Sequence, residues 1–291
     1  AGGSFFTNGR LSLNLDHWVN NSELQARQIE LNVNHFINDA AGVVRSIEDL
    51  QASGNTWLNQ GRIETDGSLS LVLSGGYQGR GALHSQGDLH FSAASATLQQ
   101  GANVRSAANT VFELGGRFQN EGTLTAVGTL QVRAHELENQ GTLGAGQWLG
   151  IGAGQLLNQG LIFSGADMAL RSHTLTNLRG DIYSLGALSI AKDDDLAAMS
   201  TLENRSGSIE SASNMQLYVA SLINRKENFR LGKELVYGHI GVTCYDCSGD
   251  HHNVDYVATE RFEISVAEDS PAARIHVGGD RSEEHTSELQ S

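Results

Sequence analysis

Short stretches of alternating apolar and polar residues recur along most of the chain. Leu130-Gln-Val132 and Leu149-Gly-Ile151, for example, place an apolar side chain at every second position. A period of two indicates a half-buried β-strand, whereas a helical period of 3.6 residues never persists through a full window. The stretches are separated by Gly, Asn-Gln-Gly or Ser-Gly. These are turn residues that tolerate positive φ, so the pattern predicts short strands joined by tight corners.

The strands belong to a repeat with a step of nineteen residues, and the copies share a column of asparagines. Clear copies begin at Trp57, Phe118, Leu137, Leu156 and Leu175, the last with one extra residue after Asn177. The asparagine column comprises Asn59, Asn120, Asn139, Asn158 and Asn177, followed by Asn204 and Asn224 in degenerate copies. Further degenerate copies start at Trp18, Phe36 and Leu98, which gives about eleven copies between Phe6 and Asn228.

One copy is too small to bury its own apolar positions, and stacked copies bury them in a continuous core. A step near twenty residues leaves room for three short strands and three corners. We therefore predict an all-β fold, a parallel β-helix of about eleven coils over residues 1–228. Parallel crossovers favour a right-handed winding. At about 4.8 Å per coil, the rod would be on the order of 50 Å long.

The asparagine column permits two interpretations. An aligned row of amides could bind a ligand. Alternatively, stacked amides hydrogen-bond to one another along the axis and satisfy the backbone groups of the corners, and we favour this structural role. The histidines fall at changing positions of the repeat, which argues against a site built from them.

The nineteen-residue repeat ends near Phe229. Residues 229–272 alternate over longer stretches and are predicted to leave the rod as a β-rich excursion, and residues 273–280 resemble the start of a further coil. Residues 281–291 resemble the translation of a sequencing-adapter oligonucleotide, and we exclude them as an artefact. Because the chain starts at Ala1 without a Met, we expect it to be an internal piece of a longer protein.

The repeat pattern L-x-N-x-G-x-L-x-[AS]-x-G-x-L-x-[IV]-x-A resembles the filamentous haemagglutinin repeat of Gram-negative exoproteins. Residues 241–256 (GVTCYDCSGDHHNVDY) are similar to the region after the first repeat array in contact-dependent growth inhibition effectors and related adhesins. This resemblance, over about residues 5–280, implies a long filament secreted or held at the surface of a Gram-negative bacterium. It also implies export by an outer-membrane two-partner-secretion transporter, through parts outside this chain, and contact with a receptor on a target or host cell.

Charge and composition narrow the chemistry. The formal net charge is −14 and no basic stretch occurs, so nucleic acid is an unsuitable partner, because phosphate neutralisation supplies much of that affinity. No apolar run approaches the roughly 20 residues that a membrane-spanning helix needs, and we expect no membrane insertion. No Ser/His/Asp set, phosphate-binding Gly loop or carboxylate pair recurs at a catalytic spacing, so we predict neither an enzyme nor a cofactor.

Cys244 and Cys247 form a Cys-x-x-Cys motif that is followed by His251 and His252. Thiolates and imidazoles are zinc ligands, so a metal site is one interpretation. A disulfide between the two cysteines suits an exported protein and is favoured over the metal, and free thiols are the third possibility.

Two further motifs have both a functional and a structural interpretation. Arg179-Gly180-Asp181 spells an integrin-binding tripeptide, but it also fills a corner where the repeat requires Gly. Lys192-Asp-Asp-Asp195 offers carboxylates for a calcium ion, and a solvated loop that bulges from the rod is the favoured alternative.

Together these observations predict a structural stalk segment of a large exported exoprotein that acts in cell–cell contact, either in adhesion or in contact-dependent growth inhibition. The alternative is a β-helix that binds or cleaves polysaccharide, since parallel β-helices also host such enzymes. Those enzymes need Asp, Arg or Lys clustered along one face of several coils. The outward strand positions here are mostly Thr, Ser, Gln, Gly and Glu without a recurring cluster.

Overall fold

A computed structural model describes residues 3–246 and 253–278 of the chain. The described residues form strands and connecting turns without any helix, so the predicted all-β class is confirmed. They accordingly contain no helix that could cross a lipid bilayer. The chain divides into two compact units, Ala1–Arg225 with Ala273–Ser291, and Lys226–Ala272.

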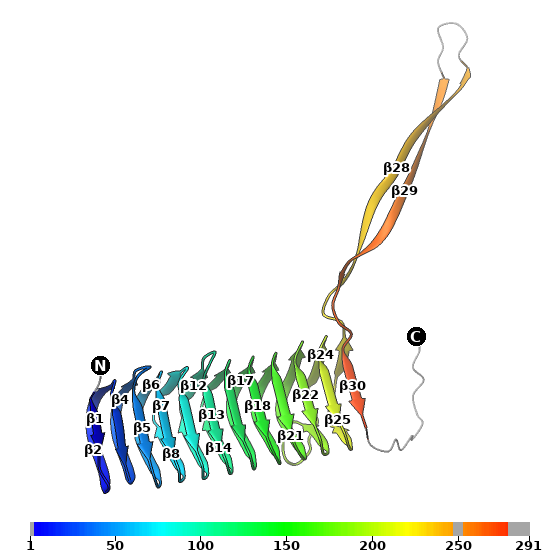
Figure 1. Cartoon of the computed structure of the whole chain (residues 1–291). Coiled ribbons are helices and arrows are strands. Elements are labelled where there is room, and N and C mark those ends of the chain that lie inside the picture. The colour runs from blue at the N-terminus through cyan, green and yellow to red at the C-terminus, as the bar shows by residue number, and fades with distance from the viewer. Residues whose placement is uncertain (1–2, 247–252, 279–291) are drawn as a thin grey trace. The chain divides into compact units, whose positions relative to one another are not determined.

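The first unit is a parallel β-solenoid of about eleven turns, as the repeat predicts (Figure 1). Each turn contributes one short strand to a twelve-stranded sheet, and one long strand or two short strands to a sixteen-stranded sheet. The strands of the first sheet are β1 (Ser4–Phe6), β3 (Glu23–Ala26), β5 (Val43–Ser46), β7 (Arg62–Thr65), β10 (Ala82–Ser85), β13 (Asn103–Ser106), β16 (Thr123–Ala126), β18 (Thr142–Ala145), β20 (Leu161–Ser164), β22 (Asp181–Ser184), β25 (Ser208–Ser211) and β30 (Arg274–Val277). We number the coils in this order.

The second sheet closes each coil. Its strands are β2 (Arg10–Asn20), β4 (Gln28–Asn38), β6 (Leu50–Asn59), β8 (Leu69–Leu73), β9 (Gly76–Gly79), β11 (Leu89–Ala93), β12 (Ser95–Leu98), β14 (Thr110–Leu114), β15 (Arg117–Asn120), β17 (Leu130–Asn139), β19 (Leu149–Asn158), β21 (Met168–Leu178), β23 (Leu188–Ala191), β24 (Thr201–Arg205), β26 (Met215–Leu217) and β27 (Leu222–Arg225). In coil seven the pairing of β17 with β19 is interrupted at His135, which divides the strand into two arms. Each of the first eleven coils therefore has up to three strand segments, and the described part of the twelfth contains only β30.

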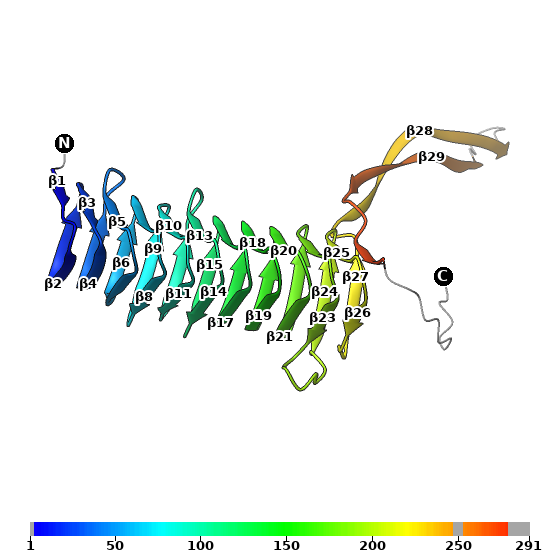
Figure 2. The same cartoon turned by 60° about the horizontal axis from the view of Figure 1, so that its bottom comes forward.

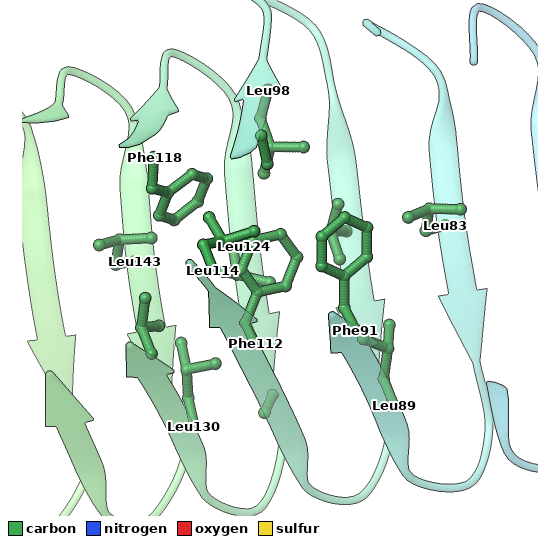
Figure 3. Close-up of a cluster of buried hydrophobic side chains, with 14 of the residues drawn as sticks. Leu83, Leu89, Phe91, Leu98, Phe112, Leu114, Phe118, Leu124, Leu130 and Leu143 are labelled. Carbon is green, nitrogen blue, oxygen red and sulfur yellow. The ribbon is translucent and has the colours of Figure 1, made fainter. Parts of the chain in front are cut away.

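The core lies inside the coils and consists of aliphatic and aromatic columns. Leu124, Leu143 and Ile162 are direct partners on consecutive strands, and all three are fully buried. Nearby, the rings of Phe91 and Phe112 stack with their centroids 4.1 Å apart (Figure 3). Each such side chain stabilises the fold by about 1.5–3 kcal/mol relative to exposure, so the alternating pattern of one coil is stabilised by its neighbours.

The corner glycines serve close packing of the backbone rather than positive φ. Among the described glycines, Gly79 and Gly101 have positive φ. Tolerance of positive φ, which the sequence analysis gave as the reason for glycine in the corners, therefore does not explain the remaining ones. At Gly141 a Cβ atom would lie 1.9 Å from the carbonyl oxygen of Gly122. At Gly61, Gly81 and Gly160 a Cβ atom would likewise lie 2.1–2.3 Å from a carbonyl oxygen of the preceding coil, so these stacked corners leave no room for a side chain.

Coils with longer corners place a non-glycine residue in the left-handed region. Arg179 has φ of 56° and Ser206 has φ of 50°, and each follows its column asparagine by two residues. The extra residue seen in the sequence after Asn177 is therefore accommodated within one corner, and the strand register continues unchanged from Asn177 to Asn204.

The second unit is an antiparallel two-stranded ribbon of β28 (Phe229–Asp246) and β29 (Asn253–Asp269). Its register shifts between Arg230 and Leu231, between Leu235 and Tyr237, and between Cys244 and Asp246. After the ribbon the chain returns to the solenoid, where β30 pairs in parallel with β25.

Candidate functional site

The column asparagines form a hydrogen-bonded ladder inside the solenoid. In each step the side-chain Nδ2 of one asparagine donates to Oδ1 of the asparagine on the next coil. The donor–acceptor distances are 2.9 Å for Asn20 to Asn38 and for Asn38 to Asn59, 2.7 Å for Asn120 to Asn139, 2.8 Å for Asn139 to Asn158 and for Asn158 to Asn177, 2.9 Å for Asn177 to Asn204, and 2.8 Å for Asn204 to Asn224.

The same amides also hold the corners. Asn158 Nδ2 donates to the carbonyl oxygens of Gly160 and Asp181, at 3.1 Å and 3.3 Å. The side chain is fully buried and its hydrogen bonds all go to protein groups within the coils. The geometry therefore assigns the buried members of this column, from Asn20 to Asn204, to the integrity of the rod, whereas Asn224 at the end of the ladder is exposed.

The ladder is interrupted at coils four and five. Gly79 and Leu98 occupy the asparagine position there, because Leu98 pairs with Asn120. The prediction of a copy that starts at Leu98 would put Gln100 at the asparagine position. It is wrong by two residues, because Leu98 itself occupies that position. Asn59 Nδ2 donates instead to the hydroxyl of Tyr77, whose pKa is raised by burial. At the other side of the gap, Asn120 Oδ1 has no hydrogen-bond partner.

A shallow groove follows the outer face of the second arm over the first five coils. Its cavity volume is about 600 Å³, and its lining includes His17, His35, Thr56, Val19 and Ile37. The rings of His17 and His35 stack with centroids 4.7 Å apart, and His35 Nδ1 lies 2.7 Å from Thr56 Oγ1. This arrangement presents two imidazoles and a hydroxyl at the surface, where they can bind a ligand.

This histidine pair was not predicted from the sequence. His17 and His35 are register partners, although we placed the histidines at changing repeat positions. The available signal was that each directly precedes the aromatic residue that opens its copy, Trp18 and Phe36. The described residues contain no group of three or more His, Cys, Asp or Glu side chains that could hold a metal ion.

The outer face of coils six and seven carries two ion pairs, Arg117 with Glu138 and Arg133 with Glu113. Arg117 Nη2 donates to Glu138 Oε2 at 2.7 Å, and this contact is the main cause that lowers the pKa of Glu138 below its usual 4.5. Burial opposes the shift, and the amide of Gln140 adds to it at 2.8 Å.

We expect Arg117→Met to raise the pKa of Glu138 toward 4.5. A depressed carboxyl pKa stabilises the fold above the unfolded-state pKa, and this contribution is lost as the pH falls through the folded-state pKa. The stability difference between wild type and variant should therefore be present at neutral pH and vanish in acid. Carboxyl NMR titration measures the pKa of Glu138, and denaturant unfolding at neutral and at acidic pH measures the stability difference. An unchanged titration of Glu138 would show that Gln140 and its neighbours carry the shift.

The other candidate residues lie apart from this surface. Cys244 is exposed and disulfide-bonded, while Cys247, His251 and His252 lie outside the described residues. The metal interpretation of this motif, which needs Cys247, His251 and His252, stays a prediction.

The tripeptide Arg179-Gly180-Asp181 forms the corner into β22. Gly180 is buried, and a Cβ atom there would lie 2.5 Å from Asn158 Nδ2, whereas Arg179 and Asp181 are exposed. The glycine is thus required by the ladder, and an adhesive role for the tripeptide stays a prediction.

The acidic residues Asp193–Asp195 lie in a loop that bulges between β23 and β24 (Figure 2). Asp194 Oδ1 lies 3.3 Å from Arg171 Nε, and Asp193 Oδ1 accepts the backbone N–H of Ala197 at 3.1 Å. Two of the three carboxylates therefore have protein partners.

Comparison with known proteins identifies the repeat. The family model of the haemagglutinin repeat matches residues 1–147 and 125–206. No curated protein and no solved structure matches the chain. Because the matched residues make up well over half of its length, this chain belongs to the haemagglutinin repeat family.

Proposed function

We propose that this chain is a structural stalk segment of a large exported exoprotein that acts in cell–cell contact. The observation that supports the proposal is the continuous apolar core of the solenoid, together with the amide ladder, which runs along it except at coils four and five. Each coil is stabilised by its neighbours, so a rod of this kind can be lengthened by adding coils. A long rod can hold the functional parts of a protein far apart. The haemagglutinin repeat family supports the same role.

The proposal extends to the location and the partners of the whole protein. It places the filament outside the cell, on the surface of a Gram-negative bacterium or secreted from it. An outer-membrane two-partner-secretion transporter exports the chain, and a distal part contacts a receptor on a target or host cell. The parent acts as an adhesin or as a contact-dependent growth inhibition effector, and this segment carries no catalytic step.

The proposal is tested by removing whole coils from the full-length exported protein. Deleting Thr123–Gly160 removes two coils and joins Gly122 to Leu161, which keeps the repeat in register. We expect a filament about 10 Å shorter that still reaches the cell surface and still attaches to target cells. Protease accessibility on intact cells and an attachment assay measure these results. The matched control, deletion of residues 123–150, breaks the register and should abolish surface display.

A binding or cleaving module would behave differently. If His17→Ala with His35→Ala abolished attachment while the filament kept its length, the groove would be a binding site and the stalk proposal would be wrong. Release of new reducing ends from acidic polysaccharide by the purified chain would likewise contradict it.

A further inference from the structure

The ribbon of β28 and β29 has one apolar and one polar face. Directly opposed residues of an antiparallel pair share a face. Leu235 is opposed to Phe262, Ile240 to Ala258 and Val242 to Tyr256, and all three pairs lie on the same face. The other face is mainly polar and carries Glu234 opposed to Glu263, His239 to Thr259 and Thr243 to Asp255, together with Tyr237 opposed to Arg261 and Val257 opposed to Gly241.

A bulge in β28 makes the apolar face continuous. Before the register shift at 235–237 the apolar residues of β28 are odd-numbered, as in Leu231 and Leu235, and after it they are even-numbered, as in Ile240 and Val242. The apolar residues of β29 that oppose them are even-numbered throughout. Since one extra residue reverses the alternation of a strand, the bulge brings both halves of β28 to the face that β29 already presents.

This face is exposed along its length. Ile240 is 66% exposed, Tyr256 70% and Ile264 66%. An isolated two-stranded ribbon is at best marginally stable in water, and a continuous apolar surface of this size marks an interaction site. Between the pairs Leu231–Val266 and Cys244–Val254, its charged residues are Lys233 and Glu260. Lys233 Nζ lies 3.7 Å from the centroid of the Phe262 ring, folded onto its own ribbon.

We propose that this face binds the same face of a second copy of the chain, about a two-fold axis parallel to the strands. Near the middle of the face Glu260 lies directly opposite Gly238, the one glycine on this face. A rotation about this axis leaves each residue at the same height along the strands and places β28 of one copy over β29 of the other. Glu260 of each copy therefore lies over Gly238 of the other. Gly238 offers room, because a Cβ atom there would meet only Leu235 Cδ2, at 3.7 Å. The face is therefore complementary to itself, as a two-fold interface requires.

The size of the face indicates a weak interface. From Val254 to Val266 the face is roughly 41 Å long, and it is about 10 Å wide across two strands. Two copies would bury on the order of 800–1,000 Å², which is less than stable specific interfaces bury and is typical of weak or transient ones. We therefore expect a weak dimer, with a Kd in the micromolar range. This inference stands independently of the stalk proposal, since it concerns the ribbon alone.

Sedimentation of the whole chain from about 1 to 500 µM tests the dimer around that Kd. We expect the mass of the wild type to rise from monomer toward dimer over this range. Ile240→Glu, on the apolar face, should weaken association at least about tenfold, because it buries a charge. His239→Glu, the neighbouring exposed residue on the polar face, should leave association unchanged. A wild type that stays monomeric overturns the proposal, as does equal weakening by both variants.

A second measurement needs no variant, so unfolding of a variant ribbon cannot be mistaken for loss of the interface. Amide hydrogen exchange of the wild-type ribbon should slow with increasing protein concentration, with the same midpoint as the mass. Exchange that is independent of concentration contradicts the proposal. A ribbon that instead binds a different protein leaves the purified chain monomeric and its exchange constant, which also overturns it.

Discussion

Replacing Asn158 by Leu should destabilise the solenoid by about 2–4 kcal/mol. Asn158 is fully buried, accepts a hydrogen bond from Asn139 Nδ2 at 2.8 Å and donates to Asn177 Oδ1 at 2.8 Å. Leu has the same branched arrangement of side-chain heavy atoms, and Leu98 already occupies this column, but Asn177 Oδ1 loses its donor and Asn139 Nδ2 loses its best acceptor. A buried polar atom left without a partner costs about 1–3 kcal/mol.

The natural comparison for this variant is already in the chain. Leu98 occupies the same column, and the oxygen of Asn120 beside it lacks a partner. Hydrogen exchange of coils seven to nine, together with denaturant unfolding, measures the loss locally, which matters because repeat arrays need not unfold in one step. Gln159→Leu changes the exposed neighbour and should stay within about 0.5 kcal/mol. Equal stability of the two variants would show that the ladder adds nothing.

Replacing Gly141 by Ala should cost on the order of 3–5 kcal/mol, the largest single effect we expect. The new Cβ would lie 1.9 Å from the Gly122 carbonyl oxygen and 2.8 Å from the Glu121 carbonyl carbon. Both are backbone atoms, so no side-chain rotation relieves the clash. The corner must open, and the bonds from Gly141 N to Asn120 O and from Thr142 N to Gly122 O, each 2.9 Å, are lost or lengthened.

Gly152→Ala is the matched control within the next coil. A Cβ at Gly152 would meet only Arg133 Cγ, at 3.7 Å, and its φ is not positive. This variant should be neutral or stabilising by about 0.4–1 kcal/mol, because Ala restricts the unfolded chain. Thermal unfolding and exchange of the corner amides compare the two. If Gly141→Ala were as stable as Gly152→Ala, close packing of the corners would not be the reason for glycine there.

Some features of the candidate surfaces were open to prediction and others were not. The asparagine column was visible because each copy repeats its own local pattern. The groove at His17 and His35 was visible only in part, since both residues precede an aromatic residue but belong to degenerate copies. The ion pair of Arg117 with Glu138 joins residues twenty-one positions apart, and it forms only when two coils stack in register.

The sequence by itself determined the fold class. A nineteen-residue step with alternating apolar positions can bury its core only by stacking, so Leu124, Leu143 and Ile162 had to become one column. The tertiary structure alone decided how backbones meet: why Gly141 must be glycine although its φ is ordinary, and why Leu98 rather than Gln100 faces Asn120. It also decided that one bulge, at 235–237, unites the apolar residues of the ribbon on one face. The physical reason is common to all three, because a repeat specifies side-chain periodicity, whereas the register and spacing of neighbouring backbones arise only when the coils and strands are brought together.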